Sequence, residues 1–341
     1  MDLLPTEEQV QIVDSVVDVL TTEFPRERHR GQGNECTEPD KAAMQKIAEL
    51  GWYSLGLEPE LGGLGYGLPE EALLFTEVGR HLGPVPALGA VLGARVASRG
   101  GQEALVGSIL AGDTRVGLAV IEDPSMDCHR PMQGQFRVLG ARGCDYVVFL
   151  GRDSAALLEI TPDMALAERG CIDATVSLGN LDLAGAHPTF AVSDNDRALY
   201  HQAVILTSAM LVGVGEAARD MAVEYAKVRE QFGKPIGAFQ AVRHPCAEAA
   251  VRVDAARAQL WFAAVCADQG RSDAGFQAAA SASLAIDAAH RNCQTNIQVH
   301  GAIGGTDEHD AHLLLKRSHL LASLFGNLDM HLSDALAAPL E

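Results

Sequence analysis

The 341-residue sequence lacks the features that mark several large classes of protein. Its 26 Lys and Arg are outnumbered by 45 Asp and Glu, and the formal charge of −19 argues against a nucleic-acid or anionic-membrane partner, which needs a basic face. Seven cysteines are scattered without a C-x-x-C pair, so we expect reduced thiols in a cytoplasmic protein. Residues 1–4 carry no basic segment of a signal peptide, and the longest apolar run, 203–215, is too short to span a bilayer.

Aromatic residues are also scarce, at 5% of the chain, and tryptophan occurs only at positions 52 and 261. Hydrophobic residues nevertheless make up 48% of the sequence, so the chain can bury a large and mostly aliphatic core. The 34 glycines and the abundant alanines suit closely packed helices. The length is sufficient for two or three domains.

The hydrophobic periodicity divides the chain into three parts. The first part shows helical spacing after a capping sequence at Thr6. From Arg115 the pattern changes to short apolar runs separated by Gly, Asp and Pro, which predicts a small antiparallel barrel or sandwich. Long helical runs then return and predict a four-helix bundle. We therefore predict a mainly α fold with a small β domain, organised as a helical domain (1–113), a middle β domain (114–193) and a helical bundle (194–341).

The same patterns predict the individual elements. N-terminal helices are expected within 1–30 and at 41–50, 69–81, 86–98 and 102–111. Strands are expected at 116–121, 136–139, 146–150, 156–160 and 174–178. C-terminal helices are expected at 196–230, 239–269, 273–300 and 307–324.

A polar corner interrupts the C-terminal helices. It spans residues 228–240 and reads Val-Arg-Glu-Gln-Phe-Gly-Lys-Pro-Ile-Gly-Ala-Phe-Gln, with Arg229 as its second residue. Gly233 and Pro235 break the first helix, because glycine loses the most entropy there and proline lacks the N–H. Phe239 and Gln240 begin the next helix. A guanidinium at such a corner offers planar, forked donors that suit a phosphate.

This corner resembles the motif Arg-x-x-Phe-Gly-x-x-Ile-x-x-x-Gln of the acyl-CoA dehydrogenase family. The sequence Gln-Val-His-Gly-Ala-Ile-Gly at 298–304 is similar to the family's second motif, Gln-x-x-Gly-Gly-x-Gly. The resemblance implies that both motifs reach across a subunit interface and hold the FAD of the neighbouring chain. The FAD-binding residues that it implies are Arg229, Phe232, Phe239, Gln240, Gln298, Gly301 and Ala302.

The family's reaction is the α,β-desaturation of an acyl-CoA thioester, in which a glutamate removes a proton and the flavin accepts a hydride. The resemblance places that glutamate either at Phe325 or at Ala203, and neither residue can move a proton. In the family, a Thr-x-Pro-x-x-Gly-Ser-Asp loop and a Trp-containing strand also pack against one face of the flavin ring. Here the loop is 121–128, without Gly-Ser, and the middle domain has no Trp. We therefore expect that the part of this chain that would bind its own flavin is degenerate, because residues of the family's binding loop and strand are missing.

With the base and the flavin-binding loop altered in this way, the chain resembles the shortened, non-catalytic subunit of the heteromeric acyl-CoA dehydrogenases of actinobacterial steroid side-chain breakdown. The resemblance implies an α2β2 heterotetramer in which a catalytic partner subunit supplies the glutamate and this chain completes its FAD site. It further implies an acyl-CoA substrate and an electron-transfer flavoprotein as the electron acceptor.

Two alternative functions and a metal site are compatible with parts of this sequence. One alternative is a self-sufficient homo-oligomeric dehydrogenase whose base is displaced to Asp307 or Glu308. The other is a scaffolding or regulatory paralogue that binds neither flavin nor thioester. His309 and His312 lie at the i, i+3 spacing of helical zinc ligands. However, the family commonly opens this helix with a similar Glu-His-Asp-Ala-His sequence, so we expect no metal.

Overall fold

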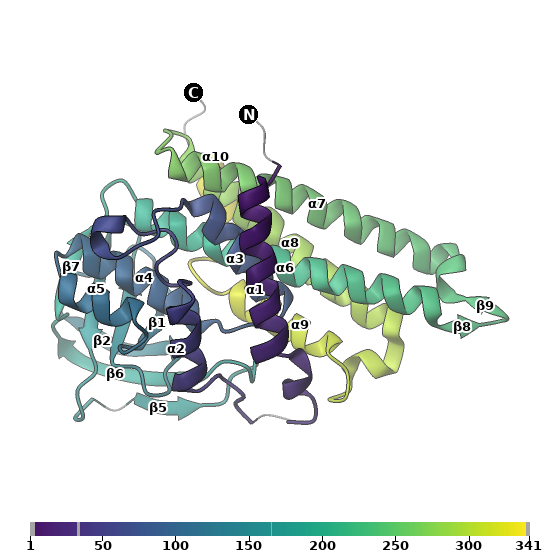
Figure 1. Ribbon diagram of the computed structural model, residues 1–341, viewed down its shortest axis with the longest axis horizontal. Coiled ribbons are helices and arrows are strands. Elements are labelled where there is room, and N and C mark those ends of the chain that lie inside the picture. The colour runs from purple at the N-terminus through teal and green to yellow at the C-terminus, as the bar shows by residue number, and fades with distance from the viewer. Residues whose placement is uncertain (1–3, 33–34, 165, 339–341) are drawn as a thin grey trace.

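The computed structural model describes residues 4–32, 35–164 and 166–338 (Figure 1). The N-terminal part of the chain is helical. Its helices are α1 (Glu7–Glu23), α2 (Lys41–Glu49), α3 (Leu68–Arg80), α4 (Pro86–Arg99) and α5 (Glu103–Leu110), with the 3-10 helices η1 (Arg26–His29) and η2 (Pro59–Leu61). The capping sequence has the expected effect at α1. The hydroxyl of Thr6 accepts the N–H of Gln9 at 3.2 Å, and the Gln9 side chain accepts the N–H of Thr6 at 2.9 Å.

A seven-stranded sheet follows and forms the left side of the molecule in Figure 1. Its strands are β1 (Val116–Val120), β2 (Met132–Leu139), β3 (Tyr146–Leu150), β4 (Ser154–Glu159), β5 (Leu166–Arg169), β6 (Leu178–Ala186) and β7 (Phe190–Ser193). Their order is β5-β6-β2-β1-β3-β4-β7. The β1–β3 pair is parallel and the other neighbouring pairs are antiparallel, so the β domain is one mixed sheet. Helix α4 packs on β1, β3 and β4.

The strand predicted at 174–178 is wrong except for its last residue. The carboxylate of Asp173 accepts the backbone N–H and the hydroxyl of Thr175, at 3.0 and 2.7 Å, and so forms a turn. Arg317, which is fully buried, donates to Asp173, Thr175 and the carbonyl of Gly83. Burial alone would raise the pKa of Asp173, but the Arg317 guanidinium keeps it below the ordinary value. The strand begins only at Leu178, and the short strands β5 and β7 were not predicted.

The C-terminal part is a helical bundle. Its helices are α6 (Ala198–Val228), α7 (Gln240–Asp268), α8 (Ala274–His300), α9 (Ala311–Leu321) and α10 (Leu328–Ala337). Between them lie the hairpin β8 (Glu230–Gln231) and β9 (Lys234–Pro235) and the 3-10 helices η3 (Ile236–Ala238) and η4 (Gly301–Gly305). Helix α10 was not predicted, and α9 begins later than expected. The predicted fold class, helical domain then β domain then helical bundle, is confirmed. The domain boundaries near 113 and 194 stay predictions.

Helix α6 is the central element of the core. A Cβ atom at Gly213 would lie 1.9 Å from the carbonyl oxygen of Thr76, and one at Gly79 would lie 2.0 Å from that of Met210. Only glycine therefore allows α3 and α6 to pack this closely, and the contact fixes the position of α6. By length and composition α6 could cross a membrane, but 83% of its most apolar window is buried inside the protein. Such a high buried fraction is typical of a helix in the core of a folded domain.

Candidate functional site

The polar corner lies where α6 ends and α7 begins, at the right tip of the molecule in Figure 1. Arg229 follows the last residue of α6, and its backbone N–H donates to the carbonyl of Tyr225 at 2.9 Å. A two-residue hairpin loop then reverses the chain, with positive φ angles at Phe232 (53°) and Gly233 (76°). The hairpin closes when the N–H of Ile236 donates to the carbonyl of Arg229 at 2.8 Å. The helix break was predicted, whereas the hairpin inside it was not.

The corner presents its side chains to solvent. Phe232 is 91% exposed, and Arg229 and Gln240 are also exposed. Phe239 is half-buried and meets the edge of Phe232 at a ring-centroid distance of 6.1 Å. Within the described part of the chain, the Arg229 guanidinium forms no hydrogen bond or ion pair. The corner therefore holds an unpaired, forked cation that a phosphate can bind.

The second motif lies at the end of α8. Gln298, Gly301 and Ala302 are exposed, like the residues of the corner. Gly301 ends α8 with a φ of 65°, and a Cβ atom built on it would meet nothing within 4 Å, so its backbone is open to a ligand. The ring of Tyr225, on the last turn of α6, stacks on His300 at a centroid distance of 4.2 Å. The structure thus joins the two helix ends that carry the two motifs.

The two positions implied for a base lie near the beginning of α6, at the opposite end of that helix from the corner. Ala203 is fully buried on α6. Phe325 has a positive φ of 57°, and its carbonyl accepts the hydroxyl of Tyr200 at 2.6 Å. The rings of Tyr200 and Phe325 also meet edge to face, with centroids 6.3 Å apart. Neither position carries a titratable side chain.

The space around Phe325 is almost completely filled. A cavity of about 10 Å³ remains between β1, Pro124, Leu150, Tyr200 and Phe325. A cavity of that size holds at most one water molecule. It does not fit the three-ring isoalloxazine of a flavin, and among the described residues no acidic side chain lines it. The expected erosion of this chain's own flavin site agrees with this geometry.

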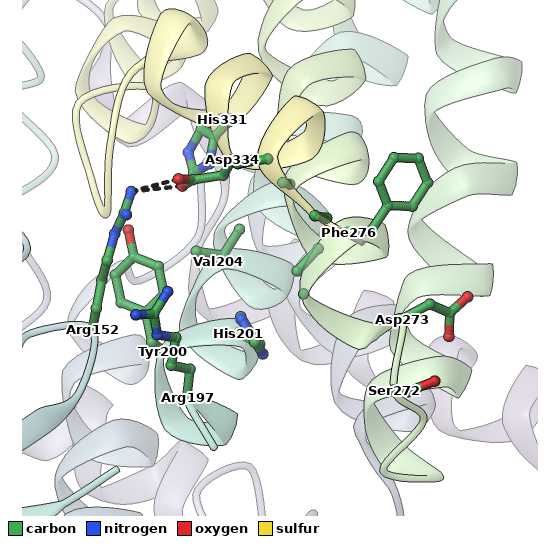
Figure 2. A pocket seen from close by; sticks show the side chains of 15 residues that line it. Arg152, Arg197, Tyr200, His201, Val204, Ser272, Asp273, Phe276, His331 and Asp334 are labelled. Carbon is green, nitrogen blue, oxygen red and sulfur yellow. Dashed lines mark hydrogen bonds and ion pairs between the residues drawn. The ribbon is translucent and has the colours of Figure 1, made fainter. Parts of the chain in front are cut away.

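A larger pocket of about 380 Å³ lies on the other side of Tyr200, at the beginnings of α6 and α8 and beneath α10 (Figure 2). In Figure 2 Arg152 points at Asp334 of α10, and their closest atoms are 2.6 Å apart. The guanidinium of Arg152 also lies 5.9 Å from the centre of the Tyr200 ring. Arg152, Tyr200 and Asp334 therefore close the pocket on the side that faces Phe325.

Among the described residues that line it, this pocket holds two imidazoles and two carboxylates. Burial lowers the pKa of His201 and of His331, so both imidazoles are neutral near pH 7. Hydrogen bonds from Arg271 and Gln277 lower the pKa of Asp273 to about 2, which leaves it a weak base. Asp334 is held by Arg152.

The acidic residues ahead of α9 are placed elsewhere. Arg30 donates two hydrogen bonds to Asp310, at 2.6 and 2.8 Å. Burial alone would raise the pKa of Asp310, but these hydrogen bonds lower it. Asp307 and Glu308 are exposed. His309 stacks on His300, and among the described residues no group of three or more His, Cys, Asp or Glu is placed to hold a metal ion.

Sequence reasoning missed the residues that close the interior. Arg152 and Asp334 are separated by 182 positions, and Tyr200 and Phe325 by 125. Neither pair belongs to a local motif, so no spacing pattern reports it. The one available signal was the aromatic side chain at Phe325, where the family resemblance implies a carboxylate.

Comparison with protein families supplies the identification. Residues 6–112 match the model described as "Acyl-CoA dehydrogenase, N-terminal domain", and residues 198–338 match "Acyl-CoA dehydrogenase, C-terminal domain". The acyl-CoA dehydrogenase IpdE2 of Mycobacterium tuberculosis is 33% identical over 84% of this chain and 82% of its own length. The chain belongs to the acyl-CoA dehydrogenase family. The predictions of an FAD-dependent oxidoreductase and of FAD as its cofactor are confirmed at the level of this family.

Other relatives of this acyl-CoA dehydrogenase chain differ in length. Acyl-CoA dehydrogenase FadE34 of M. tuberculosis is 33% identical over 82% of the chain, and the chain spans only 39% of its length. Among solved structures, the ChsE4-ChsE5 complex from M. tuberculosis has a TM-score of 0.80 and 26% identity, with all of both chains covered. The Tcur3481-Tcur3483 steroid ACAD G363A variant has a TM-score of 0.85, 23% identity and 96% coverage of each chain, which shows the shared fold.

Proposed function

We propose that this chain is the non-catalytic subunit of a heteromeric acyl-CoA dehydrogenase and completes the FAD site of a catalytic partner subunit in an α2β2 assembly. The observation that carries the proposal is the contrast between the exposed, unpaired Arg229 and the filled interior at Phe325. Desaturation of an acyl-CoA thioester needs a carboxylate within hydrogen-bonding distance of the proton that it removes. Because neither Phe325 nor Ala203 can serve, the partner supplies the glutamate.

When bound in this assembly, FAD would supply the hydride acceptor, and the present chain would hold and orient it. The Arg229 guanidinium donates its forked N–H groups to the pyrophosphate, as planar guanidinium groups do with phosphates in general. The remaining contacts are assigned to Phe232, Phe239, Gln240, Gln298, Gly301 and Ala302.

The surface around both motifs suits a protein partner. Val228 and Phe232 of the corner are 72% and 91% exposed, and Ile303 of the second motif is 50% exposed. An apolar groove of about 440 Å³ runs beside them between α6, η3 and α7. Exposed apolar patches of this kind mark interaction sites, and exposed aromatic residues are enriched in such interfaces.

The substrate and setting follow from the same family resemblance. The missing base and the altered 121–128 loop resemble the non-catalytic subunits of the steroid branch, which favours an acyl-CoA with a steroid side chain. Electrons then pass from the reduced FAD to an electron-transfer flavoprotein. The acidic composition and unpaired cysteines are consistent with a cytoplasmic enzyme.

Flavin content tests the proposal directly. The isolated chain is expected to be colourless or poorly soluble, whereas the chain co-expressed with its partner is expected to retain FAD. In the complex, Arg229→Ala removes a charge-assisted hydrogen bond of roughly 1.5–3 kcal/mol, so FAD affinity falls about ten- to a hundredfold. Arg229→Lys restores only part of the affinity, because an ammonium lacks the fork. Stoichiometric FAD on a homo-oligomer of this chain alone would overturn the proposal.

A second variant tests the absence of a base. Glu308 is exposed and lies ahead of α9, whose 11 residues span about 16 Å before the chain reaches Phe325. In the complex, Glu308→Gln should therefore leave the rate within about twofold, whereas replacing the partner's glutamate should abolish turnover with FAD still bound. If Glu308→Gln removes activity while assembly and flavin remain, this chain has its own base.

A further inference from the structure

Tyr225 connects the two motif segments. Its carbonyl accepts the backbone N–H of Arg229 at 2.9 Å, so it stands one helical turn before the corner. Its ring stacks on the imidazole of His300, with centroids 4.2 Å apart and planes 29° apart. His300 lies inside the second motif, between Gln298 and Gly301. One ring contact therefore joins the end of α6 to the end of α8.

The orientation of His300 is fixed from its other side. Its Nδ1 lies 2.9 Å from the carbonyl of Asn296, and a carbonyl only accepts, so Nδ1 carries the proton and donates it. The side-chain amide of Asn296 in turn donates to the sulfur of Met221 on α6 at 3.3 Å. Met221–Asn296 and Tyr225–His300 are thus two successive contacts, one helical turn apart, between the same two helices. The imidazole is buried.

His309 also packs against the ring of His300. The two rings are 4.3 Å apart and tilted by 49°. The Nδ1 of His309 accepts the N–H of Ala311 at 3.1 Å, which ties it to the beginning of α9. The loop that contains η4 therefore begins and ends at two imidazoles that pack against each other. A Cβ atom built on Gly301 or Gly305 inside this loop would meet nothing within 4 Å, so close packing holds neither residue there.

We infer that Tyr225 is a positioning residue for the FAD half-site, and that through His300 and His309 it holds the second motif in a fixed place relative to Arg229. The inference rests on the proposed function, because it concerns the FAD held by the assembled enzyme. A half-site made of two chain segments binds well only when the segments keep their spacing. Among the described residues the Tyr225 hydroxyl has no hydrogen-bond partner, so the ring is the part of Tyr225 that acts.

The test measures FAD affinity of the assembled complex after the flavin is removed and titrated back, with flavin fluorescence as the signal. Tyr225→Leu removes the stack and is expected to weaken FAD binding about three- to tenfold. Tyr225→Phe keeps the ring and should bind within about twofold of wild type. Phe136→Leu is the matched control, since it removes an aromatic contact of 5.1 Å with Phe149 inside the sheet. It should lower stability and leave FAD affinity unchanged.

Each other outcome overturns the inference. Wild-type affinity in Tyr225→Leu removes the positioning role, and equal loss in Tyr225→Phe assigns the effect to the hydroxyl. An equal loss in Phe136→Leu means that general destabilisation weakens the flavin. Arg229→Ala separates this inference from the proposed function. If Arg229→Ala weakens FAD binding and Tyr225→Leu does not, the positioning role alone fails. If neither variant weakens it, the half-site itself fails.

Discussion

The two ends of α6 carry opposite kinds of surface. Near its beginning, Tyr200 donates to the carbonyl of Phe325, and Asp194 accepts the N–H groups of Leu199 and Tyr200 at 3.2 and 3.1 Å. At its other end, Arg229 has an unpaired guanidinium within the described part of the chain. One helix thus joins a region where Tyr200 and Asp194 pair with groups of the interior to a region whose polar groups face outward.

This difference separates groups that stabilise the subunit from groups that are available to bind a partner. Polar groups that satisfy one another in the interior stabilise the subunit itself, because leaving a buried donor or acceptor unpaired costs free energy. Exposed cations and aromatic rings contribute little to the stability of the subunit and are available to a partner. We therefore expect substitutions near Tyr200 to change the free energy of unfolding, and substitutions near Arg229 to change assembly and FAD binding.

The largest expected effect comes from restoring a carboxylate at the start of α6. Ala203→Glu places an acid at a fully buried position on α6. An unpaired buried charge and the added volume together should lower the free energy of unfolding by at least about 3 kcal/mol, measured by urea denaturation. Ala203→Leu adds similar volume without charge and should cost less. If Ala203→Glu is tolerated and gives the isolated chain activity, the interior is an open site and the comparison fails.

A smaller effect is expected from Tyr200→Phe. This variant keeps the ring but removes the hydroxyl that donates to the Phe325 carbonyl at 2.6 Å. Because that carbonyl then lacks its donor, the free energy of unfolding should fall by about 1–2 kcal/mol. FAD content of the complex should not change. Loss of FAD with unchanged stability would show that the interior takes part in flavin binding.

The exposed end of α6 was the more predictable of the two regions. Its residues form short motifs, in which glycine and proline break the helix by local backbone effects and so can be read without the fold. The helical and strand periods likewise predicted most elements, because they reflect which face of each segment is buried. The family resemblance also located Phe325 and Ala203 as the two base positions, and that assignment stays a prediction.

The interior could not be predicted in the same way. Its closure depends on pairs such as Arg152 with Asp334, which only the tertiary structure brings together. The strand expected at 174–178 was lost for a similar reason, because the distant Arg317 holds Asp173 and Thr175 in a turn. Local β propensity was overridden there by a buried charge network.

The smallest expected effect separates stability from assembly at a single residue. Phe232 holds a left-handed φ of 53°, a conformation that costs an L-residue roughly 1 kcal/mol, while its ring is 91% exposed. Phe232→Gly removes both the strain and the ring. The isolated subunit should therefore unfold at a free energy equal to wild type or higher by up to about 1 kcal/mol. Assembly with the partner should weaken about five- to thirtyfold, because an exposed aromatic anchor is lost.

Phe232→Ala distinguishes the two causes. Alanine removes the ring but retains the left-handed strain, so this variant should weaken assembly as much as glycine does without gaining stability. Denaturant unfolding of the subunit and sedimentation of the complex measure the two quantities separately. Equal stability in both variants would mean that the hairpin relaxes and stores no strain. Unchanged assembly in both would mean that the partner does not contact this tip of the molecule, and the outward-facing end of α6 would then have another use.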